Sequence, residues 1–133
     1  MRLAAALCAP FLLFSQPAFW PNTAYDPAVP TLEKTLGYKP GERISWHGSI
    51  VRYLEALAAA QPARMKLWDY GKTWEGRRLV YAAIGSEANM KRLPDIRAAY
   101  QRLADPRKTN AAEARTLAES LPAVIWLGYG VHG

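Results

Sequence analysis

The spacing of apolar side chains along the chain first predicts a helix. Between positions 46 and 57 they recur every three or four residues, which is typical of one face of a helix, and Pro62 ends the pattern. We expect Ser45 to cap this helix, with Arg52 and Glu55 on its outer side. The stripe consists of Trp46, Ile50, Tyr53, Leu54 and Leu57.

Two short apolar runs that follow this helix predict a pair of strands. In the first run, Met65 and Leu67 alternate with polar or aromatic side chains that face the other way. Gly71 and Gly76 then bracket a turn, and residues 79–84 make the second run. We therefore expect an antiparallel hairpin.

Two further helical patterns come next. Apolar residues recur at helical spacing over positions 93–103, and Pro106 follows as a stop signal. Asn110 and Glu113 have the spacing of a capping box, which predicts the start of another helix. This helix should run to about Ser120.

The last apolar run, residues 123–127, has no polar alternation. A strand that is apolar on both faces is typical of the centre of a sheet that helices cover. We expect a central strand here, followed by a glycine-containing loop that carries His132. Ligands of open α/β sheets bind beyond the carboxyl ends of the strands, so this position suits a binding residue.

The order of these elements predicts an α/β fold with a mixed sheet, made of an antiparallel hairpin plus a central strand, with flanking helices. Residues 19–44 are rich in proline and turn residues and have no sustained period, so we expect an extended N-terminal arm laid over the domain. Residues 45–133 would form the folded unit.

Composition limits the class of protein. The chain has 133 residues, of which 50% are hydrophobic and 21% charged, as expected of one globular domain and not of a disordered chain. No segment reaches the roughly 18 to 20 apolar residues that a membrane helix needs. The net charge of +6 permits attraction to acidic partners, but it bears on association and not on fold.

Residues 1–18 have the pattern of a signal peptide. Arg2 precedes an apolar run over positions 3–14, and a cut near Ala18 would give a secreted or periplasmic protein without a membrane segment. The alternative is a native N-terminal helix, because Pro10 interrupts the run and the cleavage site is weak. Cys8, the one cysteine, would leave with the signal, so the mature chain would rely on its core or on a metal.

The residues that could carry chemistry are few. The two histidines are His47 and His132, and the sequence has no pattern of a catalytic triad, a phosphate-binding glycine loop or paired cysteines. His47 begins the first helix, where we expect a solvated or capping role. A catalytic zinc site needs three protein ligands and an open position. From the residues alone, His132 is either a terminal or core histidine or a ligand, and the function stays open.

Four stretches of the chain resemble one known family. They are YDPAVPTLEKTLGYKPGERI in the arm, YGKTWEGRRLVYAAIGS across the hairpin, MKRLPDIRAAYQRLADPRKT in the next helix and LPAVIWLGYGVHG at the end. Together they cover nearly all of the chain from Tyr25 to Gly133. In these stretches the chain is similar to the N-terminal part of a carboxypeptidase A-like zinc metallocarboxypeptidase, of the secreted bacterial branch.

This resemblance implies a single zinc ion with His132 as its first ligand. In the family this histidine opens a His-x-x-Glu pair, and a much later histidine completes the ligand set. The glutamate would fall just beyond Gly133, as would the general base and the residues that hold the substrate's terminal carboxylate. The resemblance therefore implies no catalytic and no substrate-binding residue within these 133 residues, and we expect them to be inactive alone.

The activity that the resemblance implies is removal of C-terminal residues from peptides or proteins. Zinc would polarise the scissile carbonyl and lower the pKa of its bound water towards about 7, which supplies a hydroxide-like nucleophile. A catalytically dead, carboxypeptidase-like interaction domain is an alternative, because relatives can lose their ligands.

A basic nucleic-acid-binding module is a second alternative. Asp95 and Asp105 interrupt the basic residues, and no nucleic-acid motif surrounds them, so we expect a solvated helix face and no nucleic-acid partner. The basic residues are Lys91, Arg92, Arg97, Arg102, Arg107 and Lys108.

Overall fold

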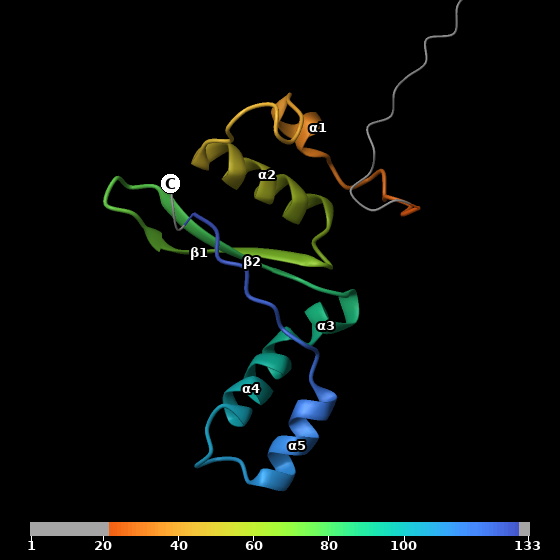
Figure 1. Ribbon diagram of the computed structural model, residues 1–133, viewed down its shortest axis with the longest axis vertical. Coiled ribbons are helices and arrows are strands. Elements are labelled where there is room, and N and C mark those ends of the chain that lie inside the picture. The colour runs from red at the N-terminus through yellow and green to blue at the C-terminus, as the bar shows by residue number, and fades with distance from the viewer. Residues whose placement is uncertain (1–21, 131–133) are drawn as a thin grey trace, which may run out of the picture.

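A helix packed on a two-stranded hairpin forms one half of the molecule, and a pair of helices forms the other (Figure 1). The structure is a computed structural model and describes residues 22–130. The predicted signal peptide therefore lies outside the described residues. The elements in chain order are α1 (Leu32–Leu36), α2 (His47–Ala60), β1 (Met65–Lys72), β2 (Arg78–Ile84), α3 (Glu87–Lys91), α4 (Leu93–Leu103) and α5 (Ala111–Ser120).

The two strands form the antiparallel hairpin that the sequence predicts. Met65 lies opposite Ile84, and the register shifts between Asp69 and Gly71, where β1 has one residue more than β2. The turn that joins them is closed by the amide of Thr73, which donates to the carbonyl of Arg77 at 2.9 Å. An α/β fold with an antiparallel hairpin and flanking helices is thus confirmed.

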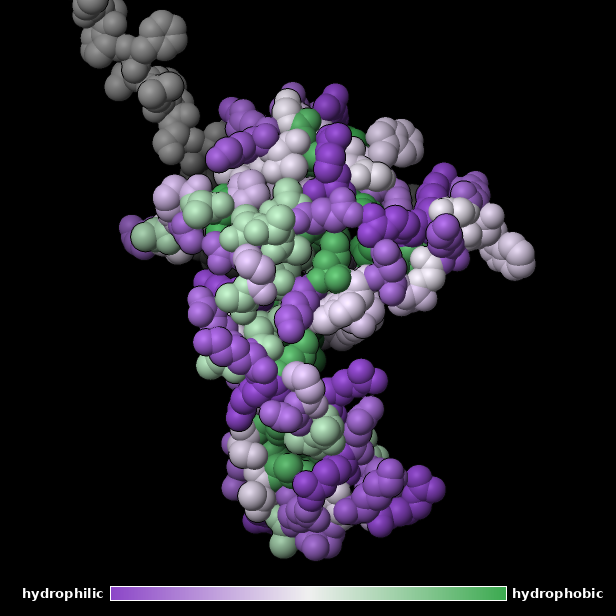
Figure 2. Space-filling view, turned by 180° about the vertical axis from the view of Figure 1, so that it is seen from behind, coloured by the Kyte–Doolittle hydropathy of each residue, from purple (hydrophilic) through white to green (hydrophobic). Residues whose placement is uncertain are grey.

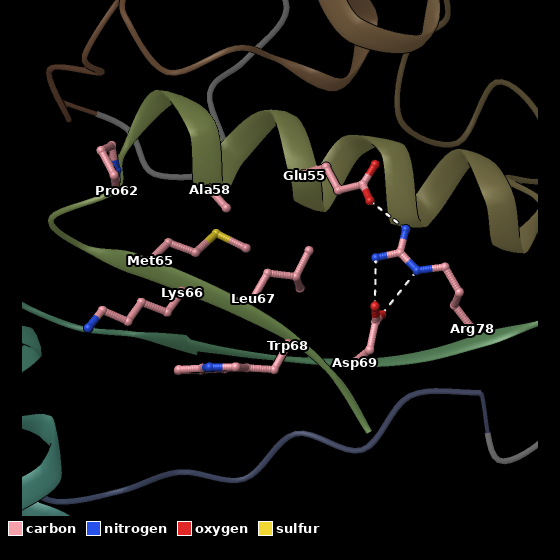
Figure 3. A pocket seen from close by; sticks show the side chains of 9 residues that line it. All are labelled: Glu55, Ala58, Pro62, Met65, Lys66, Leu67, Trp68, Asp69 and Arg78. Atoms are coloured by element: carbon pink, nitrogen blue, oxygen red, sulfur yellow. Dashed lines mark hydrogen bonds and ion pairs between the residues drawn. The ribbon is translucent and has the colours of Figure 1, made fainter. Parts of the chain in front are cut away.

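Helix α2 covers one face of the hairpin. Val51 from the helix and Met65 from β1 are buried, at 6% and 5% exposure, and Figure 3 shows Met65 and Leu67 pointing towards the helix. Two members of the predicted stripe are wrong, because Trp46 is 77% and Ile50 is 47% exposed. The helix presents positions 47, 51, 55 and 58 to the hairpin instead, which are three or four residues apart on the same face.

Ser45 does not cap α2, so that prediction is also wrong. The residue before the helix is Trp46, whose side chain makes no capping bond, and the hydroxyl of Ser45 accepts from the hydroxyl of Tyr38 at 2.8 Å. Tyr38 is 5% exposed, and the guanidinium of Arg43 lies 4.0 Å from the centre of its ring. These contacts hold the residues that precede α2 in place.

The arm contains a short helix, α1, that the sequence pattern did not predict. Thr31 caps it by accepting from the amide of Lys34 at 3.1 Å, and Gly37 ends it with φ of 79°, which a side chain would strain. The arm lies against α2, where the Tyr53 hydroxyl donates to the carbonyl of Pro30 at 3.3 Å. Partial burial there raises the pKa of Tyr53.

Helices α4 and α5 form the second half of the molecule, close to their predicted bounds. Ile96 is buried at 6% exposure, and the Asn110 side chain caps α5 by accepting from the amide of Glu113 at 2.9 Å. The short helix α3, capped by Ser86, was not predicted. Figure 2 shows the two halves from behind, joined by a narrow waist, with hydrophilic side chains over most of both.

The predicted central strand over residues 123–127 is wrong for the described molecule. The only sheet in residues 22–130 has the two strands β1 and β2, and the segment after α5 runs as an irregular trace. A strand requires a hydrogen-bonded neighbour, and within the described part no backbone hydrogen bond links residues 123–130 to another segment. Apolar character on both faces therefore did not suffice to form a strand.

No helix within the described range is long and apolar enough to cross a bilayer. The longest, α2, has 14 residues and is half-covered by polar side chains. This finding concerns residues 22–130 alone.

The contact between α2 and the hairpin gives a stability prediction. Met65→Ala should lower the free energy of unfolding by about 2 to 5 kcal/mol, because it removes a buried side chain and leaves a cavity. Ile84→Ala is the matched control, since Ile84 lies directly opposite in the register but is 73% exposed, and it should cost less than about 1 kcal/mol. Urea denaturation at low protein concentration measures both values, and equal losses would contradict the assignment of the core.

Candidate functional site

The predicted zinc ligand, His132, lies outside the described residues, but the structure describes the segment that leads to it. The hydroxyl of Tyr100 on α4 donates to the carbonyl of Pro122 at 2.5 Å. This bond fixes the start of the segment to α4. Among the described residues, no further hydrogen bond of a side chain or backbone holds positions 123–130.

The segment before His132 exposes large apolar side chains on both of its faces. The exposed fractions are 67% for Val124, 82% for Ile125, 80% for Trp126, 65% for Leu127 and 86% for Tyr129. Consecutive exposed residues of this kind differ from single apolar residues on a surface, which are ordinary. The stretch therefore has the character of a buried strand without the neighbours that would bury it.

The second histidine, His47, contacts β2. Its Nε2 lies 2.7 Å from the carbonyl oxygen of Arg78, and because a carbonyl only accepts, this nitrogen carries the proton and donates. His47 is half-buried and makes no capping bond. It ties the first turn of α2 to the first residue of β2.

Arg78 joins α2 to both strands through ion pairs that the sequence analysis missed. Its Nη1 lies 2.6 Å from Oε1 of Glu55, and its Nε and Nη2 lie 3.0 and 3.2 Å from the two carboxylate oxygens of Asp69 (Figure 3). The bonds to Asp69, and next those to Glu55, raise the pKa of Arg78. Strand alternation was the available signal, since it places Asp69 on the same face as Met65.

This bridge closes one end of a cavity of about 540 Å³ between α2 and the hairpin. Figure 3 shows Met65 and Leu67 pointing into the space below α2, and Trp68 pointing away from it on the other side of the strands. The ionic groups at its end are already paired with one another. The cavity can therefore accept apolar groups, but its polar end offers no free nucleophile.

The described part of the chain contains no zinc site of its own. Within residues 22–130, no group of three or more histidine, cysteine, aspartate or glutamate side chains is placed to hold a metal ion. A zinc site needs three such ligands, so the residues described here do not fit the ion.

The basic residues between α3 and α5 are partly used in local ion pairs. Arg107 and Lys108 bind Asp105, which lowers the pKa of that carboxyl, and Arg102 pairs with Glu113 on α5. Arg107 is the main cause of the lowered pKa, because it donates from both side chain and backbone. Neutralisation by neighbouring carboxylates weakens this stretch as a surface for phosphates.

Comparison with models of protein families, with curated proteins and with solved structures gives no match to the chain.

The exposed segment predicts self-association of the 133-residue chain. Unpaired apolar segments of high strand propensity pair with copies of themselves, so the weight-average mass in sedimentation experiments should rise with concentration. The double substitution Ile125→Lys and Leu127→Lys should shift the chain towards monomer.

Ile44→Lys serves as the control, because Ile44 is 79% exposed but stands alone in the arm. It should leave the association unchanged. Monomeric behaviour of the unsubstituted chain at high concentration would contradict the prediction.

Proposed function

We propose that this chain is the N-terminal part of a zinc-dependent metallocarboxypeptidase domain that removes C-terminal residues from peptides. His132 would be the first zinc ligand. The other two ligands, the general base and the residues that bind the substrate carboxylate would come from residues beyond Gly133. Removal of residues 1–18 as a signal peptide would place the enzyme in the periplasm or outside the cell.

The observation that carries this proposal is the segment from Pro122 to Tyr129. It is apolar on both faces, and its large side chains are 65% to 86% exposed in the described molecule. Burying a large apolar side chain contributes about 1.5 to 3 kcal/mol, so several such residues left in water are a substantial cost. A segment of this kind supports a longer chain that supplies neighbouring strands and carries His132 at a strand end.

The arrangement of the other three similar stretches also supports the proposal. The stretch YGKTWEGRRLVYAAIGS spans the turn of the hairpin, and MKRLPDIRAAYQRLADPRKT spans α4 and the turn that follows. Each stretch thus coincides with a structural unit and is not scattered over unrelated elements. The order of helix, hairpin and helices agrees with the fold class that the family implies.

The chain's own contribution to the chemistry would be the position of His132. Zinc, when bound, supplies a Lewis acid and a water of lowered pKa. A histidine just beyond a strand end is held by the sheet while leaving neighbouring positions open for a substrate. Its free ring N–H would need an acceptor that fixes the ring orientation.

Substitution of His132 tests the proposal in a longer form of the protein that continues beyond Gly133. His132→Ala should reduce peptide hydrolysis by at least about a hundredfold and lower the zinc content, because it removes a metal ligand. Release of C-terminal amino acids and zinc measured by mass spectrometry provide the two readouts. His47→Ala should retain the zinc, because the ring of His47 donates to the carbonyl of Arg78.

A second comparison separates the enzyme from a catalytically dead domain of the same family. The 133-residue chain should hold no stoichiometric zinc after dialysis, since it has one family ligand. The longer form should hold one zinc ion per chain if it is an enzyme. Zinc-free longer protein without hydrolysis would contradict the proposal and favour the dead, carboxypeptidase-like interaction domain.

A further inference from the structure

A second cavity lies between the N-terminal half of α2 and the start of β2. Its volume is about 380 Å³. It shares Glu55 and Arg78 with the larger cavity and lies on the other side of their ion pair. The lining residues are His47, Gly48, Val51, Arg52, Glu55, Arg77 and Arg78.

The walls of this cavity carry an excess of positive charge. Three arginines line it, against a single carboxylate, that of Glu55. That carboxylate is already bound by Arg78 at 2.6 Å, so it does not offset the other two guanidinium groups. The cavity therefore has two net positive charges without counting His47.

Two of these arginines keep donors available to a ligand. In the described part of the chain Arg52 makes no ion pair or hydrogen bond, and Arg77 uses its Nη2 for Glu75 at 2.7 Å. A guanidinium has five N–H groups, so most of these donors remain free. Both side chains are exposed at the mouth of the cavity, where an ion from solution can reach them.

The backbone around the cavity is held in place by contacts on its walls. His47 donates from Nε2 to the carbonyl of Arg78, and Arg78 binds Glu55 on α2 and Asp69 on β1. These bonds fix the distance between α2 and the start of β2. The arginines thus project from elements that are joined to each other and not from a loose loop.

We propose that this cavity binds a phosphate-type oxyanion between Arg52 and Arg77. The planar fork of a guanidinium matches two oxygens of such an ion, and charge-assisted bonds of this kind are the stronger class of hydrogen bond. Two free guanidinium groups match an ion with two negative charges better than a single carboxylate. The site is independent of His132 and of the proposed peptidase activity.

Calorimetric titration of the 133-residue chain with inorganic phosphate tests this proposal, with sodium chloride at equal ionic strength as the reference. Saturable binding with one site is expected. Arg52→Gln should weaken binding about tenfold or more, because it removes a charged donor without touching the core. Arg97→Gln, an equal change of charge on α4, should leave the affinity unchanged.

Glycerol 3-phosphate in the same titration distinguishes the two sources of the ligand. Tighter binding of the ester that depends on Arg52 assigns the site to a phosphate group on a larger molecule, and tighter binding of inorganic phosphate assigns it to the free ion. Absence of saturable binding of both, or an equal loss in the Arg52 and Arg97 variants, would overturn the proposal.

Discussion

A two-stranded hairpin is marginally stable in water by itself, so this molecule depends on the contact between α2 and one face of β1 and β2. Val51 and Met65 bury their side chains in that contact, and Arg78 joins the helix to both strands from its edge. The exposed ion pairs contribute little energy, since such pairs are typically worth about 0 to 1 kcal/mol. Their effect is to orient the helix, while the apolar contact stabilises it.

The other face of the hairpin has no helix over it. The rings of Trp68 and Tyr81 stack there at 5.0 Å between their centres, and Tyr70 lies 6.0 Å from Tyr81. Figure 3 shows Trp68 pointing away from α2. A hairpin with one covered face and one aromatic, open face, followed by an unpaired apolar segment, is consistent with the proposed incomplete sheet.

Local patterns in the sequence predicted those elements that depend on local interactions. The hairpin follows from alternation and from its turn glycines, and α5 follows from the Asn110 cap, which the structure contains. The rotation of α2 was predicted less well, because Trp46 and Ile50 fit the helical period but lie beside the contact face. Which apolar residues of a helix are buried depends on the partner, and the period alone does not specify it.

The remaining differences arise where non-local contacts decide the outcome. The run at 123–127 has the composition of a central strand, yet strand formation needs a neighbour with free backbone groups. Arg78 was not predicted as a bridge because its partners are nine and twenty-three residues away in the sequence. His132 was assigned through resemblance to a family, and it lies outside residues 22–130, so its role as a ligand stays a prediction.

X-ray absorption at the zinc edge tests the ligand assignment most directly, in a longer form of the protein that continues beyond Gly133. The account predicts nitrogen and oxygen neighbours at about 2.0 to 2.2 Å, with the histidine signal reduced in His132→Ala. A sulfur shell at about 2.3 Å, or a spectrum that the substitution leaves unchanged, would contradict it.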